Sequence, residues 1–143
     1  MTLRFDIEHL LAQVERDFQP PLSATLDLGA YAKKLAQKAT NFAMYSEGEL
    51  VGLVAVYCND LAGKVAYLTL AAVRKEHRGS GVGSGLLRNA IGYLTRIGFE
   101  KFRLETYKTN AGIVDYYGRF GFVTTRETER SVFLELDLAD SRA

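Results

Sequence analysis

The stretch His77-Arg78-Gly79-Ser80-Gly81-Val82-Gly83-Ser84-Gly85 is the most informative part of this chain. Glycine has no Cβ atom, so an anion can approach the backbone of such a stretch closely. An amphipathic run, Leu86 to Ile97, follows and predicts a helix. The first N–H groups of a helix have no intrahelical partner, and the helix dipole favours negative charge there. The stretch therefore predicts a loop that binds a pyrophosphate, although glycine clusters also occur in plain surface turns.

Two better-known phosphate-binding patterns do not match this stretch. A P-loop requires Gly-Lys-Ser or Gly-Lys-Thr, and neither occurs anywhere in the chain. A dinucleotide-binding fingerprint requires glycine or alanine at its sixth position, and none of the possible starting glycines provides one. The pattern that does fit is R-x-x-G-x-G, formed by Arg78, Gly81 and Gly83.

Length and composition indicate one soluble globular domain. The chain has 143 residues, of which 48% are hydrophobic and 24% charged, as is typical of such a domain. Its 18 basic and 17 acidic residues leave a net charge of +1, so no strong field points to nucleic acid or to an anionic membrane. We therefore expect neither as a partner.

The cysteine, histidine and N-terminal patterns argue against a disulfide-bonded, a metal-binding, a secreted and a membrane-spanning protein. The single cysteine, Cys58, rules out an internal disulfide and, at the end of an apolar run, is expected to be a buried hydrophobic side chain. His9 and His77 lack ligand-type spacing, so no metal is expected. Residues 1–8 do not resemble a signal peptide, and the longest apolar stretch, 50–58, is too short to span a bilayer. These features predict a cytoplasmic protein.

Hydrophobic periodicity predicts four helices and six strands. The helices are expected at residues 7–18, 26–38, 83–97 and 111–119, and the strands at 42–46, 50–57, 65–73, 101–106, 122–126 and 131–138. Gly98 is expected to cap the third helix, and residues 47–49 to close a hairpin. Residues 65–73 are nearly all apolar, which is typical of a strand covered on both faces.

The order of these elements predicts a mixed α/β sheet. Strand, helix and strand across residues 65–106 imply a right-handed crossover between parallel strands. The flanking hairpins make the rest of the sheet antiparallel. The glycine stretch then lies at the carboxyl end of a central strand, where ligands of such sheets usually bind.

Two segments together resemble the GNAT superfamily of acyl-CoA-dependent acetyltransferases. The first comprises Leu70-Ala71-Ala72-Val73, Arg78-Gly79-Ser80-Gly81-Val82-Gly83 and Leu86-Leu87. The second comprises Asn110-Ala111 and Tyr117-Gly118-Arg119-Phe120-Gly121-Phe122, which match the family's N…Y-x-x-x-G-F signature. The resemblance implies a GNAT-like fold, a central mixed sheet with splayed parallel strands flanked by helices. It also implies one domain over residues 1–143, with acceptor-side helices in 1–40, an acetyl-CoA-binding core in 64–106 and a closing helix and hairpin in 107–138.

The resemblance further implies that acetyl-CoA binds as the acyl donor. The implied cofactor-binding residues are Ala71, Ala72, Val73, Arg78, Gly79, Ser80, Gly81, Val82, Gly83, Ser84, Asn110 and Tyr117. The strand backbone would pair with the pantetheine amides, as a peptide adds to a sheet edge, and the loop N–H groups would hold the pyrophosphate. Ser84 would add a hydroxyl, and Asn110 would bond the pantetheine arm. An alternative for Asn110 is that it caps the helix expected from Ala111.

Tyr117 is the candidate for proton chemistry. Acetyl transfer expels the thiolate of CoA, and a phenol with a pKa of about 10 can donate to that sulfur. The alternative is that Tyr117 packs as an ordinary helix aromatic, like Tyr116.

The general base is a weaker part of the pattern. Many members of the family carry a glutamate on the strand before the glycine loop, and the corresponding residue here is Thr69. Proton removal would instead go through water or through a carboxylate such as Glu105 or Asp60. Glu105 is otherwise a solvated or salt-bridged carboxylate, and Asp60 a turn residue. His77 is expected to be a surface residue.

Taken together, these patterns predict an N-acetyltransferase that passes the acetyl group to a small primary amine in a ternary complex. A non-catalytic acyl-CoA sensor and an enzyme acting on protein N-termini or lysines are the alternatives. The acceptor site is expected from the first two helices and the turns at residues 59–63 and 127–130. The exposed final strands would support a homodimer.

Overall fold

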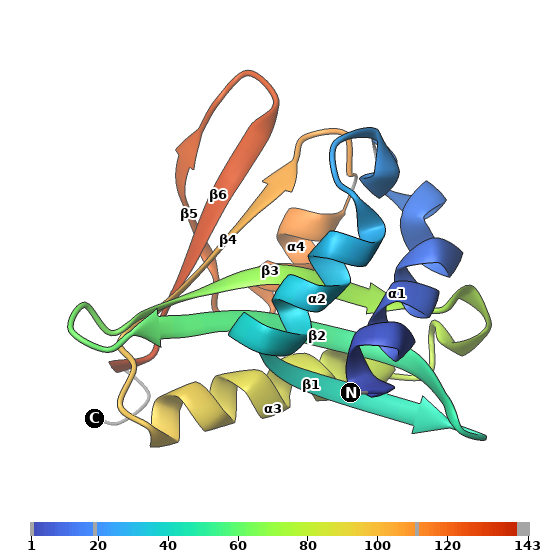
Figure 1. The fold of residues 1–143 in the computed structure, drawn as a ribbon. Helices are drawn as coiled ribbons and strands as arrows, with labels where there is room; N and C mark the ends of the chain where they lie inside the picture. Colours follow the sequence, from blue (N-terminus) through green and yellow to red (C-terminus); the bar gives the residue numbers. More distant parts are fainter. Residues whose placement is uncertain (1, 19, 111, 140–143) are drawn as a thin grey trace. The chain divides into compact units, whose positions relative to one another are not determined.

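The computed structural model describes residues 2–18, 20–110 and 112–139. The helices are α1 (Thr2–Val14), α2 (Leu28–Lys38), α3 (Val82–Arg96) and α4 (Ile113–Gly118), with 3-10 turns η1 (Glu15–Asp17), η2 (Leu22–Ala24) and η3 (Lys75–His77). The strands are β1 (Thr40–Ser46), β2 (Glu49–Asp60), β3 (Val65–Val73), β4 (Lys101–Tyr107), β5 (Val123–Glu127) and β6 (Ser131–Asp137) (Figure 1). They form a mixed sheet in the order β1-β2-β3-β4-β6-β5, which confirms the predicted class.

The chain folds as two compact units. Unit 1 consists of Met1–Tyr57 and Thr69–Ala90, and unit 2 of Cys58–Leu68 and Ile91–Ala143. Because β2, β3 and α3 are long, each of them contributes residues to both units.

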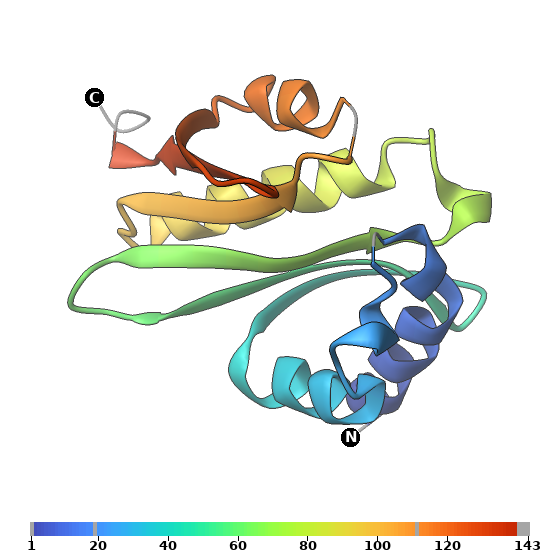
Figure 2. The ribbon, with the colours of Figure 1, turned by 90° about the horizontal axis from the view of Figure 1, so that it is seen from above.

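The core of unit 1 lies between its two N-terminal helices and its strands. Figure 2 shows α1 and α2 on the same side of the β1–β2 hairpin. The buried residues of this core are Ile7, Leu10, Leu11, Val14, Ala32, Leu35, Leu50, Leu53, Ala55, Leu70 and Ala72. The α1 members recur at the spacing of one helix face, as the sequence predicted.

The predicted ends of the first two helices were wrong. The first begins at Thr2 and ends at Val14, where the 3-10 turn η1 follows; Leu3 packs half-buried against the core and extends the apolar face of Ile7 toward the N-terminus, although Phe5 beside it is 61% exposed. The second begins at Leu28, because the Asp27 carboxylate accepts the N–H of Ala30 at 2.9 Å and caps the helix there.

The predicted hairpin around residues 47–49 is confirmed. Glu47 and Gly48 form its turn with φ angles of 50° and 80°, the conformation that suits a two-residue hairpin. Both strands are longer than predicted: β1 begins at Thr40, because the polar Thr40 and Asn41 pair with Val56 and Ala55, and β2 continues to Asp60.

The prediction that residues 65–73 are covered on both faces was wrong. Along β3, Ala66, Leu68, Leu70 and Ala72 are buried, whereas the alternate residues are exposed or half-buried. A strand that is buried on one face only can present its other residues to a ligand.

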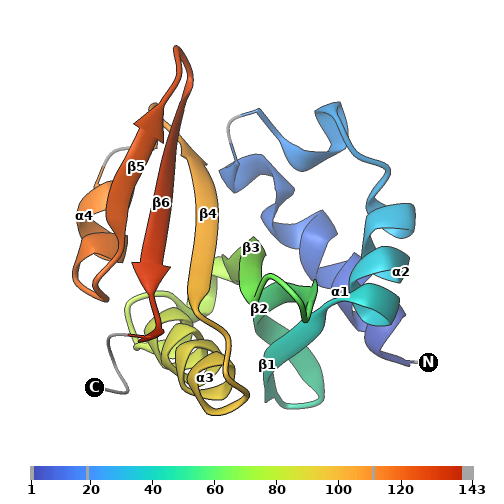
Figure 3. The ribbon, with the colours of Figure 1, turned by 90° about the vertical axis from the view of Figure 1, so that its left-hand side faces the viewer.

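Unit 2 is built on β4, β6 and β5, with α4 packed on one face (Figure 3). The pairs β4–β6 and β5–β6 are antiparallel. The parallel pairing of β3 with β4 covers only Val65–Tyr67 and Lys101–Arg103. It therefore stops before either strand ends, as expected for parallel strands that splay.

Gly98 ends the third helix as predicted. Its φ angle is 90°, its N–H donates to Thr95 O at 3.2 Å, and the Phe99 N–H donates to Leu94 O at 3.0 Å. These two bonds form a Schellman motif, for which a left-handed residue at this position is required.

The close approach of α3 to β2 in unit 1 depends on Gly52. A Cβ atom at this position would lie 2.8 Å from Val82 Cγ1 and 3.3 Å from Leu86 Cδ1. We expect Gly52→Ala to lower the free energy of unfolding by about 1–3 kcal/mol, because the stiff valine cannot move aside without strain. Chemical denaturation would measure the change. Gly85→Ala is the matched control, since a Cβ there meets open space within α3 and the change should stabilise the helix.

Candidate functional site

The glycine loop of unit 1 has the backbone conformation that an anion site requires. Gly79 and Gly81 have φ angles of 81° and 87°, which other residues rarely adopt. The Gly85 N–H donates to Gly81 O at 2.9 Å and closes the first turn of α3. Over the described residues 79–83, no N–H group donates a hydrogen bond within the protein. These five N–H groups are therefore available as donors to a bound anion.

The loop is held in shape by one side-chain and one backbone hydrogen bond. The Ser80 hydroxyl donates to His77 O at 2.8 Å, and the Arg78 N–H donates to Lys75 O at 3.3 Å. Because the Arg78 N–H is already bonded, the free donors begin at Gly79. Ser84 lies half-buried in the first turn of α3, and His77 is also half-buried rather than fully exposed.

The Arg78 side chain is bonded to protein groups. Its Nε donates to Val73 O at 2.9 Å, and its guanidinium pairs with the Asp17 carboxylate of η1. Sequence patterns gave no sign of either contact, because Asp17 is distant in the chain and belongs to no motif.

The end of β3 leads directly toward the loop, and burial alternates along it. Ala71 is exposed, Ala72 is buried and Val73 is half-buried. Two residues earlier, Thr69 bonds through both its carbonyl and its hydroxyl to the Tyr31 hydroxyl of α2, at 3.1 and 2.8 Å. A tyrosine–threonine contact therefore lies where many members of the family have a carboxylate.

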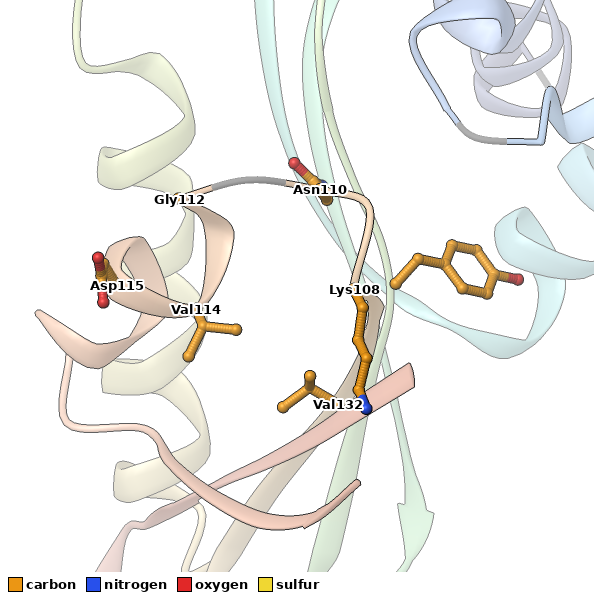
Figure 4. Close-up of a pocket in the computed structure, with 7 residues that line it drawn as sticks. Lys108, Asn110, Gly112, Val114, Asp115 and Val132 are labelled. Carbon is orange, nitrogen blue, oxygen red and sulfur yellow. The ribbon is translucent and has the colours of Figure 1, made fainter. Parts of the chain in front are cut away.

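In unit 2, Asn110 lines a pocket of about 200 Å³. Figure 4 shows Asn110 and Lys108 on one side, Val114 and Asp115 on the α4 side, and Val132 beneath. The pocket combines apolar walls with an amide at its rim. Such a lining suits a flexible chain that contains amide groups.

The expectation that Asn110 caps the following helix was wrong. The helix begins at Ile113, its N-cap is Gly112 with a φ angle of 78°, and no side chain bonds to the cap. The Asn110 carbonyl instead accepts the Ile113 N–H at 3.4 Å. The predicted start of this helix at Ala111 lies outside the described residues.

Tyr117 lies in the aromatic core of unit 2. It is 7% exposed and packs edge-on against Tyr116 and Phe122, with ring centroids 5.3 and 5.6 Å away. Burial, followed by the nearby Tyr116, raises its pKa well above the ordinary value of about 10. The hydroxyl therefore keeps its proton at neutral pH and remains a hydrogen-bond donor. Core packing and a donor role are compatible here, because the ring packs while the hydroxyl keeps its proton.

Glu105 is on the exposed face of β4, where its Oε2 accepts the Ser131 hydroxyl at 2.6 Å. It shares this face with Tyr107, and Tyr67 on β3 pairs in register with Arg103, two residues away. Burial raises the pKa of Tyr67, and the nearby Glu105 and Tyr107 add to the shift. Tyr67 was missed by sequence reasoning, although its place among apolar strand residues was a usable signal.

The remaining candidates have structural roles. Asp60 closes the β2–β3 turn, since its carboxylate accepts the Gly63 N–H at 2.8 Å. Cys58 is half-buried, so it is less enclosed than predicted. Among the described residues, no group of three histidine, cysteine or acidic side chains could hold a metal ion. Within that same part of the chain, no helix combines the length and apolarity that crossing a membrane would require.

The mixed α/β fold and the glycine loop are those expected of an acyltransferase, and a comparison with known protein families establishes that class. A model described as "Acetyltransferase (GNAT) family" matches residues 7–122, so the chain belongs to the GNAT acetyltransferase family.

Individual proteins extend the comparison. An N-alpha-acetyltransferase of Arabidopsis thaliana, MAK3, is 30% identical over 86 residues, which cover 59% of this chain and 45% of that protein. The chain spans less than half the length of the curated relatives it matches.

Solved structures share the fold. The ribosomal-protein-S18-alanine N-acetyltransferase of Escherichia coli has a TM-score of 0.78 at 19% identity, covering 96% of this chain and 89% of that one. The PaiA N-acetyltransferase of Thermoplasma acidophilum, solved with coenzyme A, has a TM-score of 0.72 at 13% identity, covering 94% of both chains.

Proposed function

We propose that this chain is an N-acetyltransferase that uses acetyl-CoA as donor and a primary amine as acceptor. The amine nitrogen attacks the thioester carbon directly in a ternary complex, the C–S bond breaks, and CoA leaves as its thiolate. The observation that carries the proposal is the glycine loop. It has five N–H groups without a partner in the protein and two left-handed glycines, and it occurs in a chain of the GNAT family.

Unit 1 would bind the donor. The N–H groups of residues 79–83 would hold the diphosphate, with the Ser84 hydroxyl beside them. Backbone groups of Ala71, Ala72 and Val73 would pair with the pantetheine amides. An N–H near Ala72 or Val73 would polarise the thioester carbonyl as negative charge develops on its oxygen.

In unit 2, Asn110 would bond the pantetheine arm, and Tyr117 would act on the departing sulfur. A thiol loses its proton more readily than a phenol does, and burial widens this difference for Tyr117. Full proton transfer from Tyr117 to the thiolate is therefore uphill. We infer that Tyr117 stabilises the thiolate mainly by donating a hydrogen bond.

Glu105 would accept the proton that the amine must lose. Its carboxylate lies on an exposed strand face, and the Ser131 hydroxyl, bonded to Oε2, leaves the other oxygen for an ammonium group. Tyr67 and Tyr107 flank it and give this face an aromatic surface on which an ammonium group can rest.

Glu105→Gln should lower kcat/KM about 10- to 100-fold at neutral pH, because the amide cannot take the proton. The deficit should shrink as pH rises toward the pKa of the acceptor amine, because a free amine needs no base. Initial rates across a pH series would measure this trend. Glu100→Gln, an exposed carboxylate elsewhere in unit 2, is the control. A deficit that stays constant with pH would exclude Glu105 as the base.

The second part of the proposal concerns the class of acceptor. We propose a small amine, amino sugar or amino acid, and protein N-termini are the second candidate because MAK3 is named an N-alpha-acetyltransferase. A panel of small amines and short peptides with free N-termini, read by release of free CoA thiol, would separate them. Turnover of peptides alone would reject the small-molecule assignment. CoA binding without thiol release from either set would indicate a sensor rather than an enzyme.

A further inference from the structure

Strand β3 is tied to the N-terminal helices of unit 1 just before the backbone proposed to meet pantetheine. The Tyr31 hydroxyl lies 3.1 Å from Thr69 O and 2.8 Å from Thr69 Oγ1. A phenol has one proton to donate, so it bonds the carbonyl and accepts from the threonine hydroxyl. The two bonds together fix both the backbone and the side chain of Thr69.

A second tie lies at the other end of the same stretch. Arg78 Nε donates to Val73 O at 2.9 Å, which fixes the last carbonyl of β3. The guanidinium of Arg78 also pairs with Asp17 of η1, a segment that follows α1 directly. The Arg78 side chain therefore joins the end of β3 to the start of the glycine loop, and the ion pair with Asp17 holds that side chain in place.

The two ties enclose only Leu70, Ala71 and Ala72. An extended strand rises about 3.3 Å per residue, so the ties are separated by about 13 Å. Within that length, the backbone has little freedom to change its direction or its register. The backbone of Ala71 and Ala72 is therefore held in a fixed conformation.

We propose that Tyr31 and Asp17 are positioning residues for the donor, which hold β3 and the glycine loop in the conformation that binds CoA. This inference rests on the proposed function. It assigns a donor-side role to two residues of the N-terminal helical segment, for which sequence patterns predicted a role in acceptor binding. Neither residue needs to touch CoA, since each acts through Thr69, Val73 or Arg78. Without the ties, part of the binding free energy is spent on ordering the strand.

The test compares Tyr31→Phe, Asp17→Asn and the double variant with the wild type. We expect each single change to raise the Kd for CoA about three- to tenfold, the effect of one lost hydrogen bond, as measured by calorimetry. The KM for acetyl-CoA should rise by the same factor, while kcat at saturating donor stays within about twofold. Asp17→Glu should restore most of the affinity, because it keeps the carboxylate.

Tyr45→Phe is the matched control. It also removes a tyrosine hydroxyl that makes a hydrogen bond, in this case a donation to the Asp6 carboxylate at 2.8 Å, but neither Tyr45 nor Asp6 belongs to the two ties. A similar rise in Kd for this control, or unchanged Kd values for Tyr31→Phe and Asp17→Asn, would overturn the positioning role. Wild-type protein that fails to bind CoA would overturn the proposed function as well, so the two failures are distinguishable.

Discussion

Gly81→Asp should weaken CoA binding by at least about 30-fold. The glycine has a φ angle of 87°, and a residue with a Cβ atom loses roughly 1–2 kcal/mol in this region. The new carboxylate would also stand among the N–H groups proposed to hold the diphosphate, where like charges repel. Calorimetric titration with CoA measures the loss directly.

Gly48→Asp is a close control for this change. Gly48 has a φ angle of 80°, a Cβ atom there also meets open space, and it lies in the β1–β2 turn of the same unit. The two variants should therefore lose similar free energies of unfolding, but only Gly81→Asp should lose CoA affinity. Equal CoA affinity in both would count against the glycine loop as the diphosphate site.

Tyr117→Phe should lower kcat about 100-fold or more while changing the Kd for CoA less than threefold. The phenyl ring preserves the contacts with Tyr116 and Phe122, so only the hydroxyl is lost. Loss of one preorganised hydrogen-bond donor to a developing negative charge typically reduces kcat by a factor of about 10² to 10³. Initial-rate assays of thiol release at saturating acetyl-CoA would measure kcat. Tyr116→Phe, which removes the hydroxyl of the adjacent tyrosine, is the control. Unchanged turnover would remove Tyr117 from the mechanism.

The raised pKa of Tyr117 also fixes the sign of the pH dependence. The group is useful only while protonated, and burial keeps it protonated beyond the ordinary tyrosine pKa of about 10. The wild-type kcat should therefore show no falling limb below about pH 10. A falling limb at lower pH that disappears in Tyr117→Phe would mean that the hydroxyl is far more acidic than its surroundings allow.

Patterns with strong local causes were predictable from the sequence. The order of helices and strands, the hairpin at Glu47–Gly48 and the stop at Gly98 follow from hydrophobic period and from glycine's access to positive φ. Helix ends were less predictable, because a local contact such as the Asp27 cap of α2, rather than apolar period, decides where a helix begins. The 3-10 turn η3 carries no sequence signal of its own.

In the candidate site, too, local features were predictable from the sequence and long-range contacts were not. Gly79, Gly81 and the residues after them could be found because an anion site needs a specific backbone. The contacts Tyr31–Thr69 and Asp17–Arg78 could not, since each joins residues far apart in the chain and neither Tyr31 nor Asp17 belongs to a motif. The one-sided burial of β3 also escaped prediction, because its exposed positions carry small or apolar residues such as Ala71.

The central claim is that the backbone N–H groups of residues 79–83 bind the diphosphate of CoA. Parallel calorimetric titrations of the wild-type protein with CoA, with adenosine 3′,5′-bisphosphate, which lacks the linking diphosphate, and with pantetheine, which lacks both the diphosphate and the nucleotide, test it most directly. We expect saturable binding of CoA and an affinity for each of the other two compounds at least about 100-fold lower. No binding of CoA, or an affinity for either of the other two compounds equal to that for CoA, would contradict the account.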